Sequence, residues 1–147
     1  MVDGRQTLRL GEGGNSVNPK QFLLIGGIVL LALGLIGFAG VFSQMNSFFY
    51  LDNAENVAHT GLGIIAIAAA YVLKDASLQK WLVVAVGVLA LFFTVYGFAV
   101  AANASPNTFG IANLESPADD ILHLVVGVWA LAAAFLGGRM AMPAKAM

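Results

Sequence analysis

The chain has 147 residues, of which 59% are hydrophobic and 10% are charged, with a formal net charge of -1 and a mean hydropathy of +0.84. A soluble domain carries charge on about a quarter of its residues, so this composition excludes an ordinary soluble protein. The sequence contains no cysteine and no basic patch, which excludes disulfides, thiolate ligands, cysteine catalysis and binding to nucleic acid.

Apolar residues are concentrated in four blocks that follow a polar, glycine-rich tail over residues 1–20. Residues 22–42 and 81–102 contain no charge and no side-chain amide, and each run reaches the roughly 20 residues that cross a hydrocarbon core. Two shorter blocks reach that length when their polar starts are included. We therefore predict an all-α membrane fold with four transmembrane helices, over about residues 21–43, 53–73, 78–102 and 117–136. These helices form a domain of residues 21–138, which is followed by a second tail, residues 139–147.

Positive charge is distributed unevenly between the loops. The seven basic residues all fall in the two tails and in the middle turn, and they are Arg5, Arg9, Lys20, Lys74, Lys80, Arg139 and Lys145. Cytoplasmic loops of membrane proteins carry an excess of Lys and Arg. The pattern predicts a multi-pass protein of the bacterial inner membrane with both termini in the cytoplasm.

The sequence repeats itself. A shift of 64 positions places Asp52 on Ser116, Glu55 on Asp119 and His59 on His123, and it also pairs Gly63 with Gly127 and Ala66 with Ala130. A shift of 60 aligns the first helix of each half. Because each half holds an even number of spans, we predict two tandem helical hairpins, residues 21–75 and 78–138, related by a pseudo-twofold axis along the membrane normal.

Each copy of the repeat opens with the pattern of a helix capping box, Asp52 with Glu55 and Ser116 with Asp119. The histidines lie one turn further along, on the same face as these carboxylates. Small residues continue that face in both copies: Gly63 and Ala66, then Gly127 and Ala130. Small residues in membrane helices allow close backbone approach, so the stripe predicts that the second and fourth helices face each other.

Three interpretations of this paired face remain open. In the first, no cofactor binds: the carboxylates cap helices and the histidines hydrogen-bond between helices. In the second, His59 and His123 are the axial ligands of a haem or of a chlorophyll-type pigment. In the third, a metal ion is held by His59, His123, Glu55 and Asp119, which are acceptable donors for zinc or iron.

Catalytic motifs are missing from the sequence: it has no Ser–His–acid spacing, no phosphate-binding loop and no metalloprotease helix motif. We expect no enzymatic activity. We expect instead an accessory or scaffold subunit of a larger membrane assembly, or a homo-oligomer, in contact with the lipid bilayer and with other membrane subunits or itself. The glycine row Gly34, Gly37 and Gly40 is the predicted contact patch. The alternative is a cofactor-binding subunit of a respiratory or photosynthetic complex that uses His59 and His123.

The repeated motif resembles a known family. The segments Asp52-Asn53 with His59-Thr60-Gly61-Leu62-Gly63 and Asp119-Asp120-Ile121-Leu122-His123 with Gly127 are similar to the motif of small four-helix bacterial membrane proteins known as domain of unknown function 4383. The resemblance covers about residues 21–138 and implies the four-span architecture. The family carries no agreed activity, so the resemblance implies no catalytic role.

Overall fold

The computed structural model describes residues 18–43 and 48–137, and these form an all-helical fold. Its four helices are α1 (Pro19–Phe38), α2 (Asn53–Val72), α3 (Ala76–Val100) and α4 (Ala118–Phe135). Each is long and apolar enough to cross a membrane, as the sequence predicted. Most of the two predicted tails, residues 1–17 and 139–147, lies outside the described residues.

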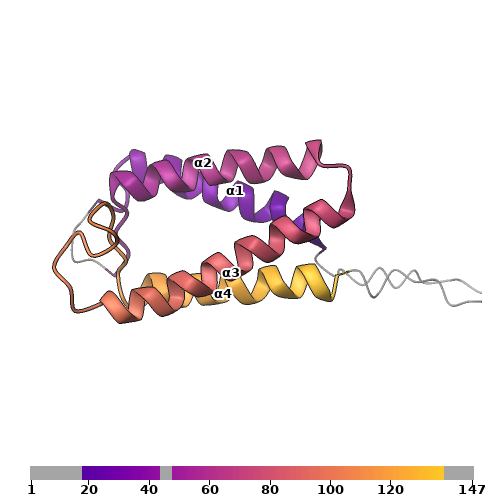
Figure 1. Cartoon of the computed structure of the whole chain (residues 1–147). Coiled ribbons are helices and arrows are strands. Elements are labelled where there is room, and N and C mark those ends of the chain that lie inside the picture. The colour runs from indigo at the N-terminus through magenta and orange to yellow at the C-terminus, as the bar shows by residue number, and fades with distance from the viewer. Residues whose placement is uncertain (1–17, 44–47, 138–147) are drawn as a thin grey trace, which may run out of the picture.

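The helices run up and down, so the bundle has two distinct ends (Figure 1). The start of α1, the α2–α3 turn and the end of α4 lie at one end, which we call the terminal end. Residues 39–43 and 48–52 and the loop over residues 101–117 lie at the other end, which we call the loop end. The charges of the described residues separate in the same way, with Lys20, Lys74 and Lys80 at the terminal end and most of the acidic side chains at the loop end.

Local sequence explains where α1 begins and ends. Asn18 accepts a hydrogen bond from the Gln21 backbone N–H, and the Gln21 side chain accepts one from the Asn18 N–H, so the two residues form a capping box around Pro19. The helix was predicted to continue to residue 43, but it ends at Phe38. The chain turns at residues 39–42, where Gly40 has a φ of 80°, a left-handed conformation that glycine adopts without steric cost.

The helices pair within each half of the chain: α1 packs along α2 and α3 packs along α4. Gly63 of α2 lies against the backbone of Gly27 and Leu31 in α1, whereas Gly127 of α4 lies against Leu91 in α3. The prediction that the glycine stripes of α2 and α4 face each other is therefore wrong. A stripe of small residues identifies a face that a neighbour approaches closely, but it does not say which helix is the neighbour.

The glycine row on α1 was also assigned to the wrong surface. Gly34 and Gly37 are buried against α2, where they contact Thr60 and Asn56. They close the first hairpin and are not available to another subunit. Only Gly40, beyond the end of the helix, is exposed.

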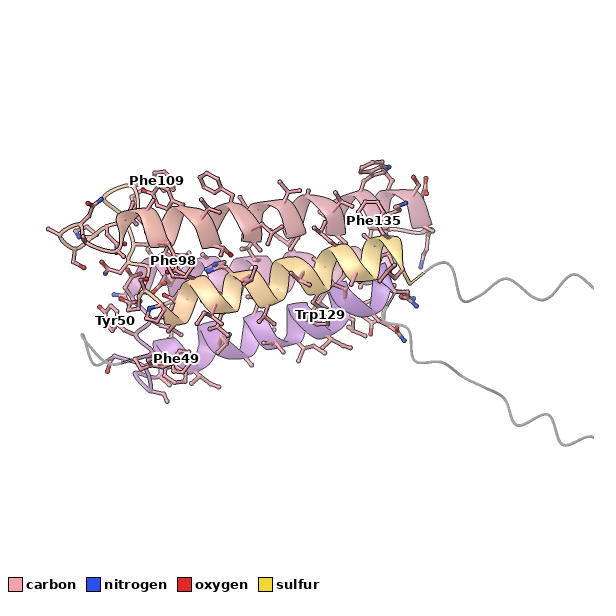
Figure 2. The ribbon with its side chains drawn as sticks, turned by 90° about the horizontal axis from the view of Figure 1, so that it is seen from below. Phe49, Tyr50, Phe98, Phe109, Trp129 and Phe135 are labelled. Atoms are coloured by element: carbon pink, nitrogen blue, oxygen red, sulfur yellow. The ribbon has the colours of Figure 1, made fainter. Side chains whose placement is uncertain are left out.

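The two hairpins join through an apolar core near the terminal end. This core combines residues from all four helices, and its most buried members are Phe22, Leu23, Ala70, Val83, Ala130, Ala133 and Ala134. Ala66 packs against the same core. The Phe22 ring meets the Trp129 ring edge-on with 4.6 Å between centroids, and Figure 2 shows Trp129 on α4, the helix that faces the viewer. Ala130 is therefore a core residue.

Candidate functional site

The polar groups singled out by the repeat gather at the loop end, and Asp52 holds the first of them in place. The Asp52 carboxylate accepts a hydrogen bond from the Glu55 N–H at 2.8 Å, and the Glu55 carboxylate accepts one from the Asp52 N–H at 2.9 Å. The predicted capping box at the start of α2 is thus confirmed. The second Asp52 oxygen accepts the backbone N–H of Asn113 at 2.9 Å, which ties the loop of the second half to the first half.

The second copy of the repeat forms a different cap. The first residue of α4 is Ala118, and the flanking Pro117 makes no side-chain cap, so the predicted capping role of Ser116 is wrong. Because the helix starts one residue later than the motif implies, Asp119 stands at its second position. Its carboxylate accepts the N–H of Glu115 at 2.8 Å, while its own N–H donates to the Glu115 carbonyl at 2.9 Å.

Three carboxyl groups from two helices and a loop meet as a result. One carboxylate oxygen each from Glu55, Glu115 and Asp119 lie within 4.8 Å of one another, and we call this set the carboxyl cluster. Asp119 is buried, and the other two side chains are partly buried. The sequence predicted that Glu55 and Asp119 would come together, but it gave no role to Glu115.

Burial makes Glu115 difficult to ionise, and neighbouring carboxyl groups add to the effect. Burial raises the pKa of Glu115 to about 8, and its hydrogen bond to the Asp119 side chain, together with the charges of Asp119 and Asp52, acts in the same direction. Two carboxyl groups that hydrogen-bond to each other must share a proton. The cluster therefore retains a proton at neutral pH unless a cation replaces it.

The two histidines lie near the cluster in different environments. His123 donates from Nδ1 to the carbonyl of Asp119 at 2.7 Å, and its ring lies 5.6 Å from that of Phe93. This bond leaves Nε2 as the nitrogen with a free lone pair. The Nδ1 atom of His59 is buried and has no hydrogen-bond partner among the described residues. His59 is close enough to His123 and Asp119 to interact with both electrostatically.

Sequence reasoning missed a second buried polar position in each half of the chain. It comes directly after Glu55 in the first half and directly after Asp119 in the second. Asn56 is 2% exposed and lies against Gly37, and Asp120 is 0% exposed and lies against Gly97. Within the described part of the chain, neither Asn56 Oδ1 nor either oxygen of Asp120 has a hydrogen-bond partner. The repeat itself could have revealed this pair. Asn56 and Asp120 are 64 positions apart, and Gly37 and Gly97 are 60 apart, which are the two shifts that align the halves of the chain.

The donors at the loop end suit a divalent metal ion better than a macrocycle. Three carboxylate oxygens with a nearby imidazole are donors that zinc, iron and manganese accept. A haem or pigment between His59 and His123 would need room beside the small residues that follow them. Gly63 and Gly127 do not supply that room, because α1 covers the first and α3 covers the second.

No family model, no curated protein and no solved structure matches the chain. The resemblance to the four-helix family stays a prediction. Any functional conclusion must therefore come from the residues themselves.

Proposed function

We propose that this chain is a non-catalytic integral protein of the bacterial inner membrane that works by association, as an accessory or scaffold subunit of a larger assembly or as a homo-oligomer. Both termini would lie in the cytoplasm. The separation of Lys20, Lys74 and Lys80 from the acidic loop end supports this orientation. Equivalent glycine contacts in the two hairpins support a duplication with its two-fold axis along the membrane normal.

A row of residues on the outer face of α2, most of them small, carries the association proposal. Its members recur at alternating intervals of four and three residues, and they are Ala54, Ala58, Gly61, Ile65, Ala68 and Val72. This is the spacing of a helix-packing seam. Four of the six have no side chain larger than a methyl group, and a methyl group added to Gly61 would meet no atom within 4 Å. We call this row the α2 seam.

The position of α2 in the bundle fits this role. Only 17% of its span is buried inside the protein, against 39% for α4. Lipid chains are as apolar as leucine side chains, so helices associate in a membrane mainly where smooth surfaces allow close packing. The four small members of the α2 seam offer such a surface, whereas the exposed positions Val57, Ile64, Ile65 and Val72 carry bulky side chains.

Association can be tested by counting subunits. The protein would be purified in mild detergent and analysed by native mass spectrometry, with chemical cross-linking in intact membranes as a second measurement. We expect a defined oligomer or a stoichiometric partner, which Gly61→Leu abolishes and the matched variant Ile64→Leu preserves. A protein that is monomeric and partner-free by both measurements would contradict the proposal.

The carboxyl cluster supports one second candidate, a metal-binding subunit. Its donors would be Glu55, Glu115 and Asp119, with His59 as the nitrogen ligand and His123 nearby. Elemental analysis and the visible spectrum of the purified protein test this function. One bound metal ion per chain, lost in Glu115→Gln, would favour it. A Soret or chlorophyll band lost in His59→Ala or His123→Ala would favour the haem or pigment alternative.

A further inference from the structure

The loop between α3 and α4 contains a turn, residues 108–112, that the proposed function does not use. The Thr108 N–H donates to the carbonyl of Ala112 at 2.9 Å, which closes the turn. Phe109 has a φ of 52° and Gly110 a φ of 71°. A left-handed backbone is unfavourable for a bulky residue such as phenylalanine, so contacts elsewhere must hold Phe109 in place.

Those contacts are aromatic, and they place the turn beside α3. The Phe109 ring stacks on the Tyr96 ring with 4.9 Å between centroids, and Tyr96 stacks in turn on Phe92 at 5.7 Å. Tyr96 lies four residues before the end of α3 at Val100, which is about 6 Å along the helix axis. Figure 2 shows Phe109 on the side of α3 that faces away from the other helices. The turn therefore folds back alongside the span.

The surface of this turn has the chemistry of a lipid contact. Phe109 is 62% exposed and Ile111 is 73% exposed. They continue the exposed apolar face that Phe92 and Val95 form on α3. Residues 101–114 contain no charged side chain. Aromatic rings concentrate where a membrane meets water.

The backbone N–H and carbonyl of Leu114, behind this surface, are both hydrogen-bonded to one side chain. The Asn107 side chain accepts the N–H of Leu114 at 2.9 Å and donates to the Leu114 carbonyl at 3.0 Å. Backbone groups that approach hydrocarbon need such partners, because lipid chains cannot supply them. The turn can therefore enter the membrane boundary without exposing the backbone of Leu114.

We infer that Phe109 and Ile111 insert between lipids at the headgroup boundary of the leaflet at the loop end, which makes the turn over residues 108–112 a lipid-binding surface. The continuity of this surface with the lipid-facing side of α3 identifies the occupant as lipid. The inference rests on the membrane placement proposed above.

The absence of cysteine from the sequence makes a direct test simple. Single variants Phe109→Cys and Ile111→Cys would carry a nitroxide label in full-length protein reconstituted into phosphatidylcholine–phosphatidylglycerol vesicles. Val95→Cys, at an exposed position of α3, is the lipid reference, and Ala104→Cys, at an exposed position of the same loop, is the loop reference. Collision rates with oxygen, which enters the bilayer, and with a polar nickel chelate, which stays in water, would be measured by electron paramagnetic resonance.

We expect the oxygen-to-nickel collision ratio at residues 109 and 111 to be several-fold higher than at Ala104→Cys and close to that at Val95→Cys. Ratios that match Ala104→Cys would overturn the inference, and so would low collision rates with both reagents, which indicate burial under protein. If Val95→Cys itself favours the nickel chelate, the membrane placement fails as well. The Ile111→Cys variant keeps the test valid should replacement of Phe109 disturb the turn.

Discussion

The two hairpins use the same glycine positions but pack with different closeness. In the first hairpin, a methyl group placed on Gly63 would lie 2.5 Å from the Leu31 backbone nitrogen and 2.8 Å from the Gly27 carbonyl oxygen. In the second, a methyl group on Gly127 would meet two side-chain carbons of Leu91 at 2.8 Å, with the backbone of Gly87 further away at 3.2 Å. Backbone touches backbone in one hairpin, and a side chain intervenes in the other.

This difference shows how a duplicated structure can diverge without losing its shape. A leucine side chain can rotate away from a new methyl group, but a helix backbone can move only if the whole helix moves. Gly34 of the first hairpin is buried against Thr60. The equivalent residue of the second hairpin is Thr94, whose hydroxyl donates to the Ala90 carbonyl at 3.1 Å. The first hairpin therefore depends more strongly on its glycines than the second does.

The largest expected effect compares the two glycines directly. Gly63→Ala should lower the free energy of unfolding by about 3 kcal/mol, because the α1 backbone must be displaced, and Gly127→Ala by about 1 kcal/mol. Unfolding in detergent with increasing SDS, followed by circular dichroism, measures both. Gly61→Ala, which meets open space, is the control and should be neutral or slightly stabilising. Equal losses at Gly63 and Gly127 would show that the hairpins are equally close-packed.

The next effect concerns the buried polar residues that differ between the hairpins. Asn56→Asp removes an amide with two donors and buries a carboxyl group beside Gly37, so we expect a loss of about 2 kcal/mol. Asp120→Asn supplies donors at the equivalent position and should be neutral or stabilise by up to about 1 kcal/mol. The same SDS titration applies. A larger loss for Asp120→Asn than for Asn56→Asp would mean that the Asp120 carboxyl group has a partner of its own, such as a cation.

The helix caps provide the third comparison. Asp52→Ala removes the capping bond of α2 and the bond to Asn113, and it should cost about 2 kcal/mol. Ser116→Ala, at the equivalent position of the repeat, should change stability by less than about 0.5 kcal/mol, because the hydroxyl caps nothing. A cost for Ser116→Ala that approaches that of Asp52→Ala would restore the capping box predicted from the sequence.

These comparisons also show what the sequence could and could not predict. The four long apolar helices and the Asp52–Glu55 box depend on local features, hydropathy and capping, and both are confirmed. The partners of Gly63 and Gly127 depend on which helix lies nearest, and the position of Glu115 depends on how a loop folds. Neither is encoded in the spacing of residues along one helix. The polar residues of the repeat lie together at one end of the bundle, but the repeat treated the two halves as more alike than they are.

The last effect depends on pH and arises from Glu115, whose counterpart in the first half is the apolar Leu51. The pKa of Glu115 rises from 4.5 to about 8 in the folded protein, chiefly because of burial. Below pH 4.5 the group is protonated in both the folded and the unfolded chain and has no effect. Between pH 4.5 and about 8 the unfolded chain releases the proton while the folded chain retains it, so the free energy of unfolding should fall as the pH rises and then level off.

Glu115→Gln removes this titration, so the midpoint of SDS unfolding in the presence of EDTA should fall less between pH 5 and pH 8 in the variant than in the natural chain. An identical pH dependence in both proteins would mean that folding does not raise the pKa of Glu115.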